Sequence, residues 1–304
     1  MRICVASGKG GTGKTTVAVN LAFVLDSDGE PVRLIDCDVE EPNAHLFVKP
    51  SWTARRSAFV PVPRIIESRC SHCGFCSEVC EFHALLVSPE KVFVLKELCH
   101  SCGACVELCP ESAIRERTRK IGAVEEGVRS AIRFTHGRLT PGEAMSVPLI
   151  KQVKSQARDD INVILDCPPG TSCPVVESVK DCDFCLLVAE PTPFGLNDLS
   201  IAADMLKQVG VPHGVAINRS DMGTGEVEEF CRRVGIPVLA RMPYDGRLAR
   251  CYARGIPVVS VSQVWRGRFR ALWDAIIDAT RKSAPERATP VAGSSEPVGQ
   301  VNGN

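Results

Sequence analysis

Short apolar runs alternate with longer segments of helical periodicity along most of the chain. Segments such as Lys14–Leu25 and Leu196–Val209 place their apolar residues at the spacing of a helix with a buried face. The apolar runs between such segments have the length of buried strands. These predicted strands are Arg2–Ala6, Val32–Asp36, Asn162–Asp166, Phe184–Ala189 and Gly214–Asn218. Strands that alternate with helices predict an α/β fold with a doubly wound, mostly parallel sheet.

A cysteine-rich stretch interrupts this alternation. It holds eight of the sixteen cysteines in two similar halves, so it is an internal repeat of one small module. Near its C-terminus the chain is rich in Pro, Gly, Ser and Val without periodicity, which predicts a disordered tail. We therefore expect the sheet domain at 1–60 and 118–284, the inserted domain at 61–117 and the tail at 285–304.

Composition excludes several classes of protein. The 304 residues are enough for about two domains of roughly 150 residues. The 36 basic and 36 acidic side chains cancel, so no global field draws the protein to nucleic acid or anionic lipid. No apolar stretch approaches the length of about 20 residues that a membrane span needs, and the N-terminus shows no secretory pattern. We expect a cytoplasmic protein in a low-oxygen setting, with thiolates kept for metal and without stable membrane insertion.

A glycine-rich loop lies between the first predicted strand and the first predicted helix. Its sequence fits the phosphate-binding pattern G-x4-G-K-[ST], in which backbone amides and a helix N-terminus meet phosphate oxygens. We expect Lys14 to contact the β- and γ-phosphates and the Thr15 hydroxyl to bind Mg²⁺. The nucleotide-binding residues predicted are Gly8, Lys9, Gly10, Gly11, Thr12, Gly13, Lys14, Thr15 and Thr16.

Polar residues also stand at the ends of three other predicted strands. Asp36 is the last residue of the second strand, and Asp38 comes two residues later. Asp166 is the last residue of the third strand, and Asn218 is the last residue of the fifth. Ligands in such sheets bind at the carboxyl ends of the strands, so these side chains are candidates for the same site as the glycine-rich loop. An acid at a strand end is also common as a helix cap, which is the alternative.

The inserted module carries two cysteine strings of the form C-x2-C-x2-C-x3-C. In this spacing three thiolates of one loop bind one cluster, and the fourth cysteine binds the other cluster. Two [4Fe-4S] clusters are therefore predicted, the first on Cys70, Cys73, Cys76 and Cys109, and the second on Cys99, Cys102, Cys105 and Cys80. The alternative is zinc, but a zinc site has a longer gap between its two cysteine pairs.

The insert resembles two-cluster bacterial ferredoxins over its whole length, which implies a small α+β ferredoxin-like domain. Pro110 follows the fourth cysteine of the second string as in that family. Glu81 replaces the equivalent proline after Cys80, which loosens the local turn and leaves all eight ligands in place.

Lys9, a second lysine early in the phosphate loop, resembles the deviant Walker A loop of the MinD, Mrp and nitrogenase iron protein superfamily. The segments DCDVEEPNAHLF, GRLTPGEA and EPTPFGLNDL are similar to the same P-loop ATPases, and the resemblance covers nearly everything except the tail. It implies ATP and Mg²⁺ as cofactors and a homodimer, or a heterodimer with a related ATPase. Lys9 would reach the partner's nucleotide; the alternative is a solvated loop charge.

The same resemblance suggests roles for individual residues. Lys9, Lys14 and Asp38 would be catalytic, with Asp38 orienting the attacking water. Thr15 would bind Mg²⁺, and Asp36 and Asp166 would hold it through water. Asp166 would also begin switch II, the second of the two segments that move with the nucleotide state in this superfamily. Asn218 would read the adenine.

Seven of the eight remaining cysteines fall into three groups. Cys182 and Cys185 lie at and near the fourth predicted strand, so packing is favoured over a metal pair. Cys173 stands where the nitrogenase iron protein has a cluster-bridging cysteine, but no second cysteine between residues 120 and 151 completes that pattern. Those that read as small buried hydrophobes are Cys4, Cys37, Cys231 and Cys251.

Three functions are compatible with these features. In the first, ATP-dependent dimerisation and switch motion are coupled to electron transfer or cluster handling with a redox or metallocofactor partner. In the second, the protein is an iron–sulfur cluster carrier or assembly factor. In the third, it is a MinD-like positioning ATPase that binds a membrane through a C-terminal amphipathic helix. The apolar stripe of such a helix is more often packed on a sheet. The stripe consists of Trp265, Phe269, Leu272, Trp273, Ile276 and Ile277.

Overall fold

A nine-stranded sheet organises the molecule, in a computed structural model that describes residues 1–157 and 160–283. Its strand order is β11-β10-β9-β1-β8-β2-β7-β6-β3, and every neighbouring pair from β11 to β7 is parallel. The last two pairs, β7 with β6 and β6 with β3, are antiparallel. The parallel strands are β1 (Arg2–Ala6), β2 (Val32–Asp36), β7 (Ile132–Leu139), β8 (Asn162–Asp166), β9 (Phe184–Ala189), β10 (His213–Asn218) and β11 (Val238–Met242).

The predicted α/β fold with a mostly parallel sheet is confirmed, and so are the five predicted strands. Sequence periodicity missed β11, β7 and the two antiparallel strands. Of the predicted helices, the first begins at Lys14 as expected and runs to Ser27, and the second begins three residues early at Pro193.

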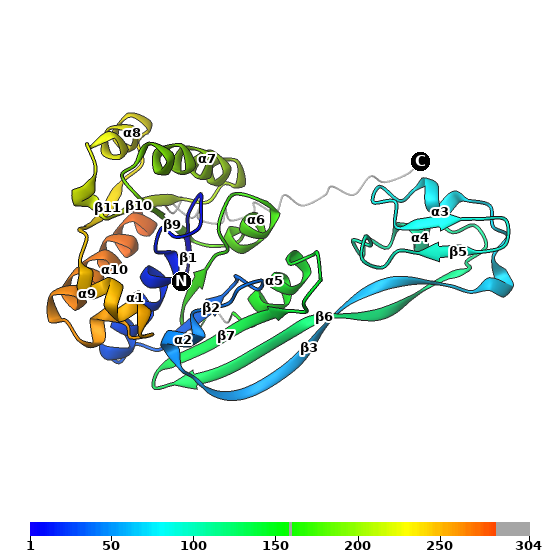
Figure 1. Cartoon of the computed structure of the whole chain (residues 1–304), viewed down its shortest axis with the longest axis horizontal. Coiled ribbons are helices and arrows are strands. Elements are labelled where there is room, and N and C mark those ends of the chain that lie inside the picture. The colour runs from blue at the N-terminus through cyan, green and yellow to red at the C-terminus, as the bar shows by residue number, and fades with distance from the viewer. Residues whose placement is uncertain (158–159, 284–304) are drawn as a thin grey trace, which may run out of the picture.

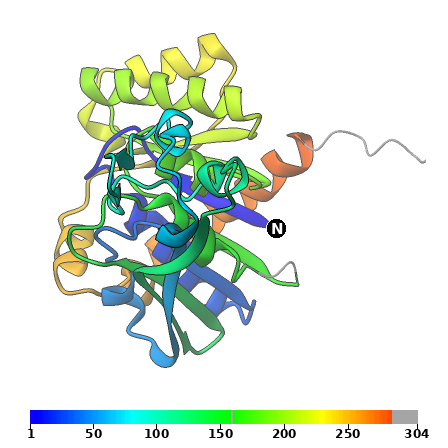
Figure 2. The ribbon, with the colours of Figure 1, turned by 90° about the vertical axis from the view of Figure 1, so that its right-hand side faces the viewer.

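Helices cover both faces of the sheet (Figure 1). One face is packed by α1 (Lys14–Ser27), α2 (His45–Val48), α9 (Gly246–Ala253) and α10 (Gln263–Ser283), together with the 3-10 turn η3 (Val258–Ser260). The other is packed by α5 (Val147–Lys154), α6 (Cys173–Val179), α7 (Pro193–Val209) and α8 (Glu226–Val234). Figure 2 shows α7 and α8, in yellow-green and yellow, as a separate layer beside the sheet. A further 3-10 turn, η2 (Ser220–Met222), follows β10.

Helix α10 buries its apolar stripe against the sheet. Trp265, Phe269, Leu272, Trp273 and Ile276 are at most 2% exposed and belong to one apolar core. The packing reading of this stripe is therefore confirmed. No helix among the described residues is both long and apolar enough to span a bilayer.

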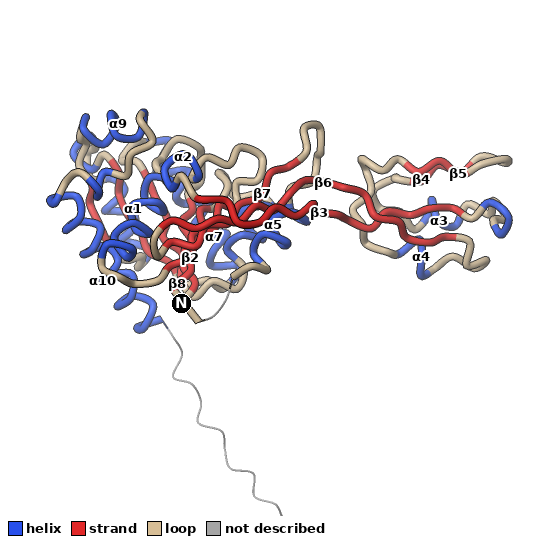
Figure 3. Tube along the Cα trace, turned by 90° about the horizontal axis from the view of Figure 1, so that it is seen from below, coloured by secondary structure: helices blue, strands red, loops and turns tan. Residues whose placement is uncertain are grey.

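Strands β3 (Ser51–Ile65) and β6 (Ile114–Arg129) form a long antiparallel arm that leaves the sheet (Figure 1, Figure 3). They pair continuously from Ser51 opposite Val128 to Ile65 opposite Ile114, with two register shifts. The far end of the arm carries the cysteine-rich module, built from η1 (Glu67–Arg69), α3 (Phe75–Glu78), β4 (Leu85–Val87), β5 (Val92–Val94) and α4 (Ala104–Glu107). This module occupies residues 66–113, between the two strands of the arm.

The two halves of the module repeat the same backbone. Helices α3 and α4 are each four residues long and each follow a glycine in the left-handed region, Gly74 with φ 84° and Gly103 with φ 79°. Only glycine adopts this conformation without strain. The predicted tail at 285–304 lies outside the described residues.

Candidate functional site

The glycine-rich loop joins β1 to α1 and directs its backbone toward a cavity. Gly11 and Gly13 have φ of 80° and 100°. Gly13 is the N-cap residue of α1, and no side chain among the described residues accepts a capping hydrogen bond at this end of the helix. A side chain at Gly13 would be strained by its φ of 100°, and its Cβ would lie 2.8 Å from Nδ2 of Asn218, which would have to shift. The loop therefore has the shape and the helix N-terminus of an anion-binding turn.

A cavity of about 430 Å³ opens at the carboxyl ends of the parallel strands. The glycine-rich loop and α1 supply one wall, and Lys14 lies there with only 8% of its surface exposed. Asp38 comes from the segment after β2, and Asn218 ends β10. The lining is Gly10, Gly11, Gly13, Lys14, Thr15, Thr16, Asp38, Glu41, Asn43, Pro169, Asn218, Arg219, Pro243, Tyr244, Asp245, Leu248, Ala249 and Tyr252. Both its size and its place suit a small-molecule site of this fold.

The wall from Pro243 to Tyr252 was missed by sequence reasoning. It follows β11, the parallel strand that periodicity did not identify, so its place at the sheet edge had no signal. Asp245 was the one residue of this wall whose local role the sequence could indicate, because an aspartate before a helical segment predicts an N-cap.

Asp166 ends β8 with a buried carboxylate close to Thr15 of the glycine-rich loop. The side chain is 1% exposed, and neither oxygen has a hydrogen-bond partner among the described residues. Burial raises the pKa of Asp166 to about 7, against the opposing effect of the nearby Thr15 hydroxyl and Lys14 ammonium. Buried carboxylate and hydroxyl oxygens side by side are the ligands that Mg²⁺ prefers. Asp166 and Thr15 therefore fit a magnesium ion.

Asp36 uses its carboxylate differently. One oxygen accepts the N–H of Asp38 at 3.0 Å, and the other accepts those of Asn43 and Ala44, each at 3.0 Å. Burial and the neighbouring Asp166 charge raise its pKa well above the usual range. Asp36 holds the segment after β2 in place and is not part of the cavity lining; its role toward Mg²⁺ stays a prediction.

Asp38 does line the cavity, and it faces Lys14. Burial raises its pKa, while the N–H of Glu41 and the Lys14 ammonium oppose that rise. Its Oδ1 accepts the N–H of Glu41 at 3.4 Å. Asp38 and Glu41 are therefore the two carboxylates of the segment after β2 that line the cavity.

Lys9 points away from the cavity of its own loop. Its Nζ lies 3.7 Å from Oε2 of Glu190, and its side chain is about one third exposed. Arg219 approaches the other oxygen of Glu190 at 2.9 Å. Asn218 donates from Nδ2 to the carbonyl of Thr12 at 2.8 Å, so it braces the loop as well as lining the cavity.

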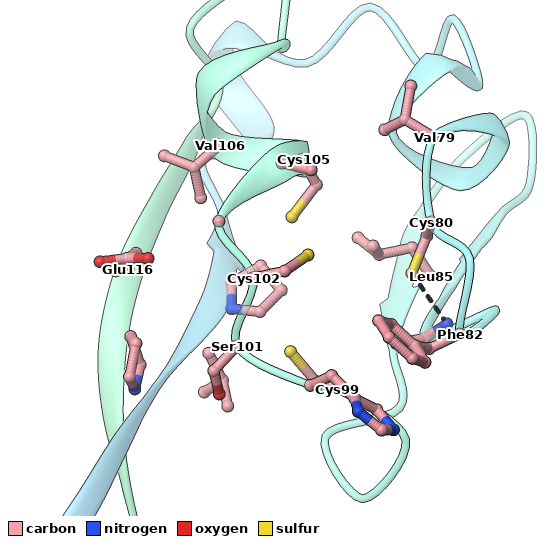
Figure 4. A pocket seen from close by; sticks show the side chains of 17 residues that line it. Val79, Cys80, Phe82, Leu85, Cys99, Ser101, Cys102, Cys105, Val106 and Glu116 are labelled. Atoms are coloured by element: carbon pink, nitrogen blue, oxygen red, sulfur yellow. Dashed lines mark hydrogen bonds between the residues drawn. The ribbon is translucent and has the colours of Figure 1, made fainter. Parts of the chain in front are cut away.

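Two further cavities lie in the module at the end of the arm, and each is lined by four cysteines. Cys70, Cys73, Cys76 and Cys109 line the first thiol cavity. Cys80, Cys99, Cys102 and Cys105 line the second thiol cavity. Figure 4 shows the second: three cysteines come from one loop and Cys80 from the facing one, with the sulfurs turned toward the space between them. These are the two sets of four that the spacing predicts.

The backbone favours thiolates at the fourth cysteine of each string. The N–H of Ala84 donates to Sγ of Cys80, and the N–H of Ala113 donates to Sγ of Cys109, each at 3.3 Å. Burial and the neighbouring thiols raise the pKa of Cys105 to about 11, so a positively charged group is needed to hold that sulfur as a thiolate.

The thiols surround space and do not converge on a point. In the part of the chain that the structure describes, no three His, Cys, Asp or Glu side chains lie close enough together to hold one metal ion. Ligands arranged around a space suit a polynuclear cluster better than zinc, whose four ligands meet at one tetrahedral centre.

The other cysteines lie in the sheet domain. Cys4, Cys37 and Cys231 are fully buried as predicted, whereas Cys251 is partly exposed. Cys182 and Cys185 belong to the apolar core, which confirms packing for that pair. Cys173 is exposed at the start of α6.

Comparisons with known proteins agree with this geometry. Residues 3–258 match the family model described as the CobQ/CobB/MinD/ParA nucleotide binding domain. An uncharacterized protein of Methanocaldococcus jannaschii is 30% identical over 259 residues, which are 84% of this chain and 90% of the relative. An iron-sulfur cluster carrier protein of Pyrococcus horikoshii is 25% identical over 284 residues, 85% of this chain and 79% of its own.

The fold has a solved counterpart in septum site-determining protein MinD of Pyrococcus horikoshii, complexed with Mg-ADP. The TM-score is 0.57 at 19% identity, over 93% of this chain and 98% of that one. The chain belongs to the CobQ/CobB/MinD/ParA nucleotide-binding family.

Proposed function

We propose that this chain is an ATPase whose nucleotide cycle acts, through the β3–β6 arm, on two [4Fe-4S] clusters at the end of the arm. One observation carries the proposal. Each of the two cavities in the module is lined by the four cysteines that the spacing assigns to one cluster. A continuous pair of strands, β3 and β6, joins this module to the sheet domain that contains the nucleotide cavity.

The nucleotide half rests on the family and on the residues of the cavity. Lys14 and the amides of the glycine-rich loop would bind the phosphates, and Thr15 with Asp166 would hold Mg²⁺. Asp38 would orient the attacking water, since it lines the cavity and interacts electrostatically with Lys14. Asn218 would meet the base while it braces Thr12.

The module half rests on the eight thiols. When bound, a [4Fe-4S] cluster supplies one-electron transfer. The cysteines would hold the two clusters, and the N–H groups of Ala84 and Ala113 would stabilise two of the thiolates. Cys73 and Cys102 are exposed, so one ligand of each cluster faces the surface where a redox or metallocofactor protein could dock.

A ladder of hydrogen-bonded strands joins the two halves. Asp36 at the end of β2 lies opposite His136 of β7, which lies opposite Glu125 of β6. His136 and Glu125 also meet through their side chains, Nε2 to Oε2 at 2.7 Å. A displacement of the segment after β2 therefore has a short path to the root of the arm.

A second candidate is an iron–sulfur cluster carrier, which the names of several relatives favour. The exposed ligands Cys73 and Cys102 suit release of a cluster as well as electron transfer. The positioning function has less support, because the apolar stripe of α10 is covered by the sheet.

The test begins with protein purified without oxygen. About eight irons and eight sulfides per chain are expected. MgATP, compared with MgADP, should change the low-temperature EPR signal or the reduction potential of the reduced protein, and Lys14→Ala should abolish that change. Bound iron near zero would refute the module assignment, and spectra blind to nucleotide would refute the coupling. Transfer of iron and sulfide to an apo-acceptor would favour the carrier.

A further inference from the structure

A second large cavity lies at the root of the arm and belongs neither to the nucleotide site nor to the thiols. Its volume is about 520 Å³, and we call it the root cavity. It lies where β3 and β6 join β7 and α2. Its lining is His45, Trp52, Thr53, Ala54, Arg55, Glu125, His136 and Arg138. Small-molecule sites have this size.

The root cavity shares a wall with the nucleotide cavity. Asn43 lines the nucleotide cavity, and His45 lines the root cavity. Between them, Ala44 is fixed by its N–H to the carboxylate of Asp36. The segment from Asn43 to His45 therefore contributes to the walls of both cavities.

The charge of the wall favours an anion. Arg55 is paired with Glu125, Nε to Oε1 at 3.2 Å. Arg138 has no ion-pair or hydrogen-bond partner among residues 1–157 and 160–283. A guanidinium at the wall of a cavity can bind a carboxylate or phosphate with two parallel hydrogen bonds.

Two imidazoles in the wall lack a partner for one nitrogen. Nδ1 of His45 and Nδ1 of His136 are buried without a hydrogen bond to any described residue, and His136 is only 1% exposed. Because Nε2 of His136 meets a carboxylate oxygen of Glu125, that nitrogen carries the proton, and Nδ1 of the neutral ring is an acceptor. A hydroxyl group satisfies such an acceptor. Buried polar atoms without partners are uncommon and point to a missing ligand or water.

Trp52 supplies an apolar face to the same cavity. It stacks on His136 with ring centroids 5.1 Å apart and keeps half of its surface exposed. An exposed indole over a polar wall suits the C–H face of a polyhydroxylated ligand. His45, His136 and Glu125 do not form a metal site, because no three His, Cys, Asp or Glu side chains among the described residues lie close enough together to hold one metal ion.

We propose that the root cavity binds a small hydroxylated organic anion, whose carboxylate or phosphate group pairs with Arg138 and whose hydroxyls meet His136 and His45. The two possible heads share one chemistry and are separated by the choice of probe. This site does not depend on the clusters or on ATP hydrolysis.

The test is isothermal titration calorimetry of the full chain with glucose 6-phosphate, gluconate and neutral glucose. At least one charged probe should bind saturably below about 10 mM, while glucose should not. Arg138→Gln should weaken that binding at least about tenfold. Arg133→Gln, an exposed arginine of the same strand outside the cavity lining, is the matched control and should bind as the wild type does.

A second readout reports from the wall itself. Binding should change the fluorescence of Trp52, and Trp52→Phe should remove that change while the buried Trp265 and Trp273 remain. The proposal is overturned if no probe saturates, if glucose binds as well as the anions, or if Arg138→Gln and Arg133→Gln behave alike. Unchanged MgADP binding in all three variants excludes misfolding as the cause.

Discussion

At the residue scale, Asp245 joins the nucleotide cavity to the helices behind it. Its Oδ1 accepts the N–H of Arg247 at 2.8 Å and so caps α9, and its Oδ2 accepts Nε1 of the buried Trp265 at 2.9 Å. Asp245→Ala removes the cap and leaves the indole N–H unpaired. We expect a loss of about 2 kcal/mol or more in the free energy of unfolding, measured by chemical denaturation.

Asp245→Asn is the control, because an amide oxygen can still cap the helix. The contacts to Arg247 and Trp265 hold the pKa of Asp245 well below its usual range. A lowered folded-state pKa means that the stabilisation is present above about pH 4 and is lost as the pH falls below it. Wild type should therefore lose more stability than Asp245→Asn on acidification. Equal acid sensitivity of the two proteins would contradict this account.

Single thiols give the second residue-scale prediction. Cys80→Ser removes one ligand from the second thiol cavity, so bound iron should fall from about eight to about four per chain. Cys173→Ser is the matched control, since Cys173 is exposed and lies outside both thiol cavities. Iron and sulfide analysis measures both. A shared third cluster on Cys173 would show instead as iron above eight in the wild type, lost in this variant.

At the scale of elements, the arm shows where periodicity stops being informative. Strand β3 is exposed along most of its length and buries a side chain only at Ala58, Val60, Val62 and Pro63. The run from Ser51 to Ser57 is exposed throughout, so this half of the strand lacks the apolar alternation that marks a half-buried strand. The five parallel strands β1, β2, β8, β9 and β10 could be predicted because helices pack on both of their faces and most of their residues are buried.

The prolines of β3 suggest an element-scale prediction. Pro61 and Pro63 fix the backbone of an edge strand near the module end of the arm, opposite Thr118 and Glu116. The double variant Pro61→Gly, Pro63→Gly should make the arm flexible, because glycine frees the same torsions. Bound iron and nucleotide affinity should stay unchanged. The nucleotide-dependent EPR change proposed above should fall by about half or more.

The double variant with valine at both positions is its control, since β-branched residues favour a strand. This control should keep the EPR change. If the glycine variant kept it too, the arm would not be the path between the two sites. If the glycine variant lost its iron, the prolines would be needed for the module itself.

At the scale of the whole molecule, the sequence predicts motifs made of neighbouring residues and misses cavities whose walls come from distant parts of the chain. The glycine-rich loop and both cysteine strings could be predicted because each motif is made of a few closely spaced residues. The wall around Tyr244 and the root cavity could not, because Trp52, Glu125 and Arg138 come from three separate strands. Asp36 shows the same limit: a strand-end acid predicts a ligand, and only the fold shows its oxygens meeting three backbone amides.

Lys9 gives the prediction that belongs to the assembly. It lies on the nucleotide-binding loop, yet it pairs with Glu190 outside the cavity that the loop forms. A lysine that turns away from its own nucleotide site is free to enter that of a second copy. In phosphoryl transfer a cation supplied by a partner stabilises charge that develops in the transition state.

Lys9→Ala should therefore keep nucleotide binding and lose both the ATP-dependent dimer and ATP hydrolysis, the latter by on the order of 10³-fold. Lys14→Ala, in contrast, should lose nucleotide binding itself, because Lys14 is buried in the cavity wall. Sedimentation with MgATP and with MgADP measures the dimer, and calorimetry measures binding. Mixing Lys9→Ala with a Lys14→Ala chain should restore part of the activity, because in the mixed dimer one active site has both its own Lys14 and the partner's Lys9, while the other site has neither. A Lys9→Ala monomer that hydrolyses ATP at the wild-type rate would show that the lysine is only a solvated charge.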